Sequence, residues 1–231
     1  MNQSPPRKLK FIHITKNAGT SIENIAQEAK INWGRFDEDL KFLSKTFWHQ
    51  PFTFDNHPLK QRKIIENNDL FAVVRNPYTR CISEYYCKWG GPKNVNGTRE
   101  QLNNYLQNKL TKIHTLQKKY AVLLQNQTES GKFFNKYEEI WHRASYGHFF
   151  PQYAYIYREN GTQYVKNVIK FENLQQEFNS LMQKYNLKMR LNRHDNKSRS
   201  NKLTVNDLAP KTKELIYQVY KKDFELFGYN K

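Results

Sequence analysis

Two short segments of the chain carry residue types that are suited to holding phosphate groups. In the first, an apolar run at residues 9–14 leads into a polar turn with Lys16, Gly19, Thr20 and Ser21. Glycine lets the backbone approach an anion closely, and the N–H groups at the start of a helix point toward such an anion. Lys16 adds a positive charge beside it. The pattern predicts a phosphate-binding turn between a strand and a helix, and the alternative is an ordinary turn capped by Thr20 or Ser21.

The second segment begins with the apolar run at residues 70–74, which ends in Arg75. Pro77 suits the first turn of a following helix, because its missing N–H costs little there, and Ser83 lies on that helix. Arginine supplies a bidentate fork of donors and serine a hydroxyl, so both can reach one phosphate. The alternative is that Arg75 pairs with a carboxylate and Ser83 is an exposed hydroxyl. Together the two segments predict a ligand with two separate phosphate groups.

The elements that must position these residues alternate between strands and helices. Three apolar runs are expected to be buried strands: residues 9–14, 70–74 and 164–171. Three other stretches have the spacing of amphipathic helices: residues 20–30, 172–185 and 210–227. Such alternation indicates an α/β fold with a parallel sheet, in which ligands bind beyond the carboxyl ends of the strands. We therefore expect both turns at one edge of the sheet, with residues 70–74 as a central strand.

The chain of 231 residues is long enough for one domain with a sizeable core, and we expect residues 1–231 to form it. The helix after Arg75 is expected to end at residues 90–92, Gly-Gly-Pro, a strong stop signal. Residues 90–146 are polar and contain no recognisable repeat. We expect them to form a helical elaboration in several pieces rather than a separate domain.

The balance of charge favours anionic partners. Lysine and arginine number 38 against 21 acidic residues, which gives a formal net charge of +17. Such a charge attracts nucleotides, acidic glycans, nucleic acids or membrane surfaces, and the alternative is a solvated basic surface. No RNP, zinc-finger or basic-helix pattern occurs in the sequence, so we expect no specific nucleic-acid partner. The aromatic content of 15% predicts a packed globule rather than a disordered basic chain.

Two features of the sequence concern its compartment. If Cys81 and Cys87 share a helix, six residues of rise separate them by roughly 9 Å, beyond the roughly 7 Å limit for a disulfide. The absence of a disulfide framework favours a reducing compartment. No stretch approaches the roughly 20 apolar residues of a membrane span, and residues 1–10 lack a signal-peptide hydrophobic region. We expect a cytoplasmic protein without a membrane segment, and the alternative is a truncated Golgi-lumenal domain.

The two phosphate-binding segments together resemble the sulfotransferases, in particular their carbohydrate and bacterial-type branch. Residues 14–21 are similar to the family's strand followed by Pro-Lys-Thr/Ala-Ala/Gly-Gly/Ser-Thr-Ser, with Thr15 in place of the usual proline. Residues 74–83 match the family's Val-Arg-Asp/Asn-Pro-x-x-Arg-x-x-Ser in full. Residues 90–146 show no similarity to the family. Four later segments resemble it in the right order: residues 148–152, 168–174, 195–199 and 220–229.

The resemblance implies a P-loop-NTPase-like three-layer fold, with a central parallel sheet flanked by helices. It also implies an enzyme that moves a sulfuryl group from 3′-phosphoadenosine 5′-phosphosulfate (PAPS) to a hydroxyl of an acceptor, commonly a carbohydrate. The resemblance assigns Arg75 and Ser83 to the 3′-phosphate, and it implies that Ser198 and Arg199 cover the nucleotide. Residues 90–146 would then lie near the acceptor, for which an acidic glycan fits the charge. Six residues are assigned to the 5′-phosphosulfate: Lys16, Asn17, Ala18, Gly19, Thr20 and Ser21.

Sulfuryl transfer to a hydroxyl needs a cation beside the leaving phosphate and a base for the hydroxyl proton. Lys16 is suited to the first role, by the electrostatics that also stabilise phosphoryl transfer. For the base the resemblance favours His49, with His148 second through its His-x-x-Pro-Gln segment. An unperturbed histidine titrates near neutral pH, so either can act. His57 is a further candidate, and His13 on the first strand is expected to be structural.

Two other functions stay open at this point. A P-loop nucleotide kinase shares the strand–turn–helix unit, although a Walker A loop has its lysine after the second glycine and here Lys16 precedes Gly19. A non-catalytic polyanion-binding module would also explain the charge. The acidic residues 37–39 are expected to form a solvated turn, and no His/Cys set with metal-ligand spacing is evident. We therefore expect no metal site.

Overall fold

The computed structural model describes residues 8–37, 63, 66–87, 91–92, 97–125, 147–157, 161–192 and 203–231. The chain divides into two compact units. We call them the sheet unit, Met1–Arg75 with Ala154–Lys197, and the helical unit, Asn76–Tyr153 with Ser198–Lys231. The single domain expected over residues 1–231 stays a prediction.

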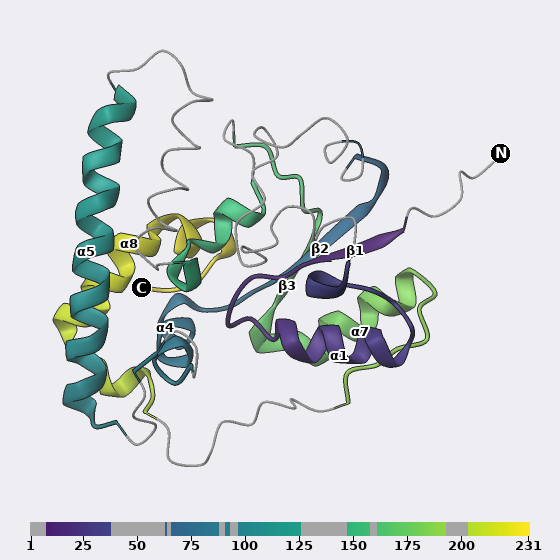
Figure 1. The fold of residues 1–231 in the computed structure, drawn as a ribbon, viewed down its shortest axis with the longest axis horizontal. Coiled ribbons are helices and arrows are strands. Elements are labelled where there is room, and N and C mark those ends of the chain that lie inside the picture. Colours follow the sequence, from purple (N-terminus) through teal and green to yellow (C-terminus); the bar gives the residue numbers. More distant parts are fainter. Residues whose placement is uncertain are drawn as a thin grey trace. The chain divides into compact units, whose positions relative to one another are not determined.

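Among the described residues, the sheet unit contains three parallel strands in the order β1-β2-β3: Leu9–Ile12, Asp69–Val74 and Asn167–Lys170 (Figure 1). Phe11 pairs with Phe71, and Phe71 in turn pairs with Asn167. Because the strands are parallel, their carboxyl ends meet at one edge of the sheet. The expected α/β class, the three strands and the central place of β2 are confirmed.

Two helices of the sheet unit, α1 (Gly19–Glu28) and α7 (Leu174–Lys184), pack on one face of the sheet (Figure 1). Alternate strand side chains contribute to this core: Leu9, Phe11, Phe71, Val73 and Ile169. Ile22 of α1 and Phe178 of α7 meet them and are fully buried. Burying one such side chain stabilises the fold by about 1.5–3 kcal/mol, so this core holds both helices to the strands. The packing of α1 on the strands thereby holds the turn between β1 and α1 in place.

The helical unit is built from α4 (Pro77–Tyr85), α5 (Arg99–Gln125) and α8 (Pro210–Phe227). α8 packs against both other helices, and it has the bounds expected from the sequence. α5 contributes a buried apolar stripe at helical spacing: Leu102, Leu106, Leu110 and Ile113. Short 3₁₀ turns complete the described chain: Gly34–Phe36, Gly147–Phe149, Gln152–Tyr155, Phe171–Asn173 and Val205–Asp207.

Two helices differ from the sequence-based expectation. α4 ends at Tyr85 rather than at residues 90–92, because the Cys87 N–H donates to the Glu84 carbonyl at 2.8 Å and closes the last turn. Residues 90–146 were expected to form several helical pieces, and their described part contains α5 as one helix of 27 residues. No helix in the described part of the chain is both long and apolar enough to cross a membrane.

Asp37 does not lie in a solvated turn, so that expectation is wrong. Its side chain is 4% exposed and accepts two hydrogen bonds from Lys10 Nζ on β1, at 2.9 and 3.0 Å. A buried lysine without a counter-charge costs several kcal/mol, and Asp37 supplies that charge. Glu38 and Asp39 lie outside the described residues.

Neither of the two cysteines forms a disulfide bond. Cys81 lies within α4 and Cys87 lies two residues beyond its end, and both side chains are buried. Burial raises the pKa of the Cys81 thiol to about 12. Cys81 is therefore protonated at neutral pH and packs as a small apolar side chain.

Candidate functional site

The turn after β1 has a backbone conformation that side-chain-bearing residues rarely adopt. Lys16 and Ala18 both have positive φ, 67° and 62°, which costs roughly 1–2 kcal/mol per residue. Asn17 lies between them, is 1% exposed, and donates its side-chain amide to the Val73 carbonyl of β2 at 2.7 Å. This hydrogen bond ties the turn to the end of the neighbouring strand. The sheet therefore supports a turn conformation that the local sequence would not adopt alone.

The helix that follows the turn begins without a side-chain cap. Its capping residue is Ala18, which has no side-chain acceptor for the first-turn N–H groups. Gly19 is the first helical residue, and it is followed by the exposed Thr20 and the buried Ser21. The alternative of a turn capped by Thr20 or Ser21 is therefore wrong. Helix starts of this kind present N–H groups and a partial positive charge to an anion.

Arg75 lies at the same turn as Lys16. Arg75 Nη1 donates to the Lys16 carbonyl at 3.3 Å, and the guanidinium carbon lies 4.1 Å from the ring centre of Phe171. Phe171 directly follows β3, so the ends of all three strands contribute to this arrangement. The Lys16 ammonium has no hydrogen-bond or ion-pair partner among the described residues. The guanidinium of Arg75 and the backbone of Lys16 thus meet at the carboxyl edge of the sheet.

A buried network supports the turn from behind. Glu23 of α1 is fully buried and lies 2.7 Å from His13 Nδ1, and its carboxylate accepts the Arg35 backbone N–H at 2.9 Å. A Cβ on Gly19 would clash with atoms of the His13 ring. The imidazole therefore leaves no room for a side chain at this position. This steric role of Gly19 adds to its expected role beside an anion. The sequence signal for Glu23 is its place on the apolar face of α1, where a charged residue needs a partner.

Ser83 belongs to the other unit from the residues above. It lies on α4 and is half-buried, whereas Lys16, Asn17, Ala18, Gly19 and Arg75 belong to the sheet unit. The structure thus brings the first turn together with Arg75, and it assigns Ser83 to the helix that starts directly after them. The joint role of Arg75 and Ser83 stays a prediction.

His148 lies in the 3₁₀ turn Gly147–Phe149 of the helical unit, and its ring is engaged through Nδ1. This nitrogen lies 3.9 Å from the Cys87 sulfur and 3.0 Å from a carboxylate oxygen of Glu84. Hydrogen bonds to Cys87 and Glu84 raise the pKa of His148 to about 9, so the ring keeps its proton at neutral pH. A protonated imidazole cannot accept a proton, which weighs against His148 as a general base.

The segment after His148 is anchored by a buried carboxylate that the sequence analysis did not identify. Asp223 of α8 is fully buried and accepts the backbone N–H groups of Gln152 and Tyr153, both at 2.9 Å. Tyr220 on the same helix donates its hydroxyl to the Phe149 carbonyl at 2.8 Å. Two of the segments that resemble the family, residues 148–152 and 220–229, therefore lie in contact. Asp223 could have been identified from the sequence, because it lies at helical spacing among the apolar residues of α8, where a charged residue needs a partner.

Several candidate residues lie outside the described residues. These are the favoured base His49, the further candidate His57, and Ser198 and Arg199 of the late loop. Their assignments stay predictions from the sequence.

Comparison with known proteins adds one finding to this geometry. Residues 1–230 match the family model described as the sulfotransferase family. No curated protein and no solved structure matches the chain. The match covers nearly the whole sequence, and it includes both strand-end turns described above. The chain belongs to the sulfotransferase family.

Proposed function

We propose that the protein transfers the sulfuryl group of PAPS to a hydroxyl of a carbohydrate acceptor. Membership of the sulfotransferase family means sulfuryl transfer in general, and the donor and acceptor are our proposals. The observation that carries them is the contact between the turn of Lys16 and the guanidinium of Arg75 at neighbouring strand ends. Two cations at one sheet edge suit a nucleotide with phosphate groups at its 3′ and 5′ positions.

The donor is proposed to lie along this edge. Arg75 and Ser83 hold the 3′-phosphate, and Ser198 and Arg199 lie over the nucleotide. The uncapped start of α1 supports the assignment of the 5′ end, because it offers N–H groups rather than a capping side chain. Phe171 stacks on the Arg75 guanidinium and restricts its orientation. Six residues hold the 5′-phosphosulfate in this proposal: Lys16, Asn17, Ala18, Gly19, Thr20 and Ser21.

The reaction combines one bond formed, one bond broken and one proton moved. The acceptor oxygen bonds to sulfur, the bond between sulfur and the 5′-phosphate oxygen breaks, and the hydroxyl proton passes to a base. Lys16 neutralises the charge that develops on the leaving phosphate. His49 is the proposed base and His148 the second candidate. The engagement of His148 Nδ1 by Glu84 favours His49.

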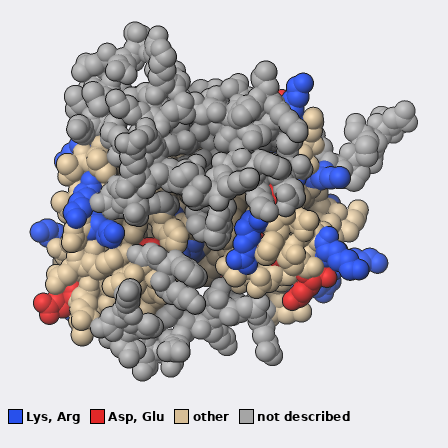
Figure 2. Space-filling model, in the orientation of Figure 1, with Lys and Arg blue, Asp and Glu red and all other residues tan. Residues whose placement is uncertain are grey.

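The acceptor is proposed to be an acidic glycan. The net charge of +17 attracts anionic chains, and basic side chains outnumber acidic ones among the coloured residues of Figure 2. Residues 90–146 are proposed to shape the acceptor side, and within them α5 carries the exposed Lys112 and Lys118. Tyrosine hydroxyls and small alcohols are the other acceptors to screen. Mass spectrometry of acceptor pools incubated with isotope-labelled PAPS identifies the product.

Ligand-dependent thermal unfolding tests this proposal against the two other functions. A ligand at a hundred times its Kd stabilises the folded state by about 2.7 kcal/mol. We expect the donor product, 3′-phosphoadenosine 5′-phosphate, to raise Tm, and ATP with Mg²⁺ to leave it unchanged. A response to ATP and Mg²⁺ alone would support the nucleotide kinase. Binding of bulk DNA as tight as that of the nucleotide would support a polyanion-binding module.

A further inference from the structure

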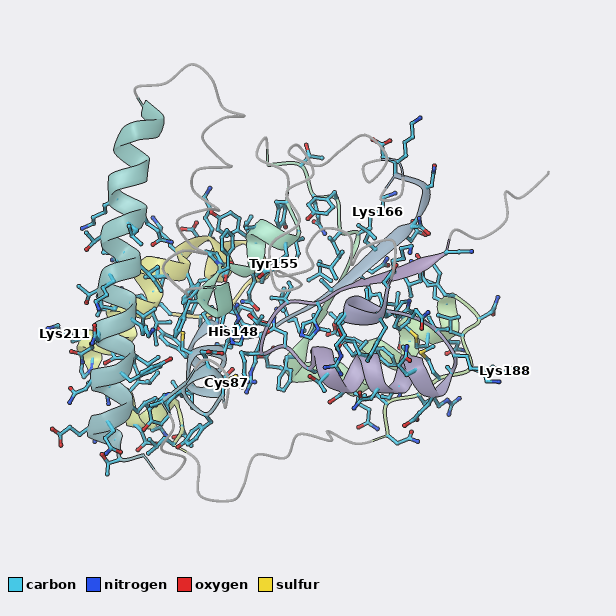
Figure 3. The ribbon with its side chains drawn as sticks, in the orientation of Figure 1. Cys87, His148, Tyr155, Lys166, Lys188 and Lys211 are labelled. Carbon is cyan, nitrogen blue, oxygen red and sulfur yellow. The ribbon has the colours of Figure 1, made fainter. Side chains whose placement is uncertain are left out.

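Three side chains of different chemistry converge inside the helical unit. Glu84 lies in the last turn of α4, Cys87 follows the end of that helix, and His148 lies in the turn Gly147–Phe149. One nitrogen, oxygen or sulfur atom of each residue lies within 4.8 Å of the others. Figure 3 shows Cys87 and His148 next to each other. The cluster draws on two segments that are far apart in the sequence.

These three groups are the donor types that zinc prefers in proteins: an imidazole nitrogen, a thiolate sulfur and a carboxylate oxygen. Zinc bonds of about 2.0–2.3 Å in a tetrahedron place the donor atoms roughly 3.3–3.7 Å apart. His148 Nδ1 lies 3.0 and 3.1 Å from the two Glu84 oxygens and 3.9 Å from the Cys87 sulfur. The observed separations bracket the tetrahedral ones. The donor atoms of Glu84 and Cys87 also lie within 4.8 Å of each other.

Burial distinguishes this cluster from an ordinary surface ion pair. The side chain of Glu84 is 2% exposed, Cys87 is 7% exposed, and only the His148 side chain, at 23%, reaches solvent. The Cys87 sulfur lies 3.9 Å from His148 Nδ1 and makes only a weak hydrogen bond, so the thiol adds little to the ion pair of His148 and Glu84. As a thiolate, the same sulfur is a strong zinc ligand. A divalent cation would also neutralise the two anionic groups that these buried side chains provide.

We propose that Glu84, Cys87 and His148 bind one zinc ion, with a water molecule in the fourth position beside the partly exposed imidazole. The ion links the end of α4 to the turn Gly147–Phe149. Arg80 also reaches this turn, but its Nη2 donates to the His148 carbonyl and leaves the ring nitrogen to the other ligands. The site shares His148 with the second candidate for the base, and sulfuryl transfer by Lys16 and His49 needs no metal in the function proposed above. It goes beyond that function and replaces the expectation of no metal site.

Metal content and cobalt spectroscopy of the full chain test the site. The protein is produced in zinc-supplemented medium, purified without chelator or affinity tag, and analysed by mass spectrometry for metals. We expect about one zinc per chain, and we expect cobalt added to the metal-free protein to give a thiolate-to-cobalt charge-transfer band with tetrahedral d–d bands. Cys87→Ser should lose the charge-transfer band. Cys81→Ser, which alters the other buried cysteine outside the cluster, should keep it.

Two results would overturn the proposal. One is a folded wild-type protein that takes up neither zinc nor cobalt. The other is a charge-transfer band that persists in Cys87→Ser or disappears in Cys81→Ser alone. If Cys87→Ser does not fold, the wild-type cobalt spectrum and the Tm of metal-free protein with added zinc decide the question. A missing band together with an unchanged Tm counts against the site, whatever the sulfotransferase assay gives.

Discussion

Lys16 lies in the turn before α1, and its ammonium has no partner among the described residues. The start of this helix presents backbone N–H groups that suit an anion. A cation in this place can act at two stages. It can bind the ground state of the donor, or it can stabilise the charge that grows on the leaving phosphate. The backbone N–H groups serve the first purpose without Lys16, so we assign the lysine mainly to the second.

Replacing Lys16 by alanine should therefore affect turnover more than donor binding. We expect kcat to fall by about 10²–10³, the usual effect of removing one transition-state donor, with a much smaller change in the Kd of 3′-phosphoadenosine 5′-phosphate. Steady-state kinetics and calorimetric titration measure the two effects. The matched control is Lys188→Ala, an exposed lysine elsewhere in the sheet unit. Unchanged turnover in Lys16→Ala would remove its assigned role.

Arg75 is expected to contribute to donor affinity rather than to the chemical step. Charge-assisted hydrogen bonds contribute about 1.5–3 kcal/mol each, so Arg75→Ala should weaken nucleotide binding by roughly ten- to a hundredfold. Arg75→Lys should restore little, because lysine lacks the planar fork and the stacking on Phe171. The exposed Arg190 offers a matched control as Arg190→Ala. Equal affinity in wild type and Arg75→Ala would contradict the assignment of the 3′-phosphate.

The proposed base is tested at His49. A general base contributes typically about 10²–10⁴-fold, so His49→Ala should lower kcat by that amount while the nucleotide still binds and the protein stays folded. The comparison is His148→Gln, judged by circular dichroism and by the same kinetic assay. Full activity in His49→Ala combined with a large loss in His148→Gln, but not in Cys87→Ser, which removes another proposed zinc ligand, would move the base to His148.

At the scale of elements, the sequence predicts what local patterns determine. β2 follows from a continuous apolar run, and α8 follows from its apolar stripe with Pro210 in the first turn and Gly228, at φ 64°, beyond the end. The two site turns were predicted from residue types that suit phosphate, and the structure brings Lys16 and Arg75 together. The strand, the helix and each turn depend on neighbours within a few residues, whereas the contact between Lys16 and Arg75, 59 residues apart, was expected from the rule that the carboxyl ends of parallel strands meet at one edge.

The parts that escaped prediction depend on residues far apart in the chain. Asp37 was expected in solvent and instead pairs with Lys10, which only the packing of the sheet unit brings near. Phe171 lies below Arg75 because β2 and β3 are adjacent and parallel. Gly19 has a second role because the His13 ring occupies the space of its absent side chain. A sequence pattern cannot report these distances, which arise only when the elements pack.

The contact between Gly19 and His13 makes a prediction about the element that carries the donor turn. In Gly19→Ala the new Cβ would meet the imidazole, so the free energy of unfolding should fall by about 1–3 kcal/mol, as for other overpacked sites. Adding His13→Ala removes the obstruction, and the pair should show a coupling energy of about 0.5–3 kcal/mol. Urea unfolding with an unchanged m-value measures both quantities. Strict additivity of the two substitutions would show that the ring does not limit this position.

At the scale of the whole molecule, the net charge contributes a long-range electrostatic attraction that no single residue provides. A net charge of +17 produces a field that draws anionic ligands to the protein and increases their rate of association. Salt screens such a field, since the Debye length falls from about 10 Å at 0.1 M to about 3 Å at 1 M. Contacts inside a partly buried donor site are screened less. Charge on the acceptor should therefore determine how strongly the reaction depends on salt.

We predict that the KM for an acidic glycan rises several-fold between low and high salt, whereas the KM for a neutral glycan of the same length stays nearly constant. The reason is that the acidic chain loses the attraction of the basic surface, and the neutral chain never had it. kcat should change little for either acceptor, because Lys16 and the base act at short range. The measurement is a pair of kinetic series across ionic strength at fixed, saturating PAPS. A parallel rise of both KM values would mean that the positive charge serves some purpose other than acceptor selection.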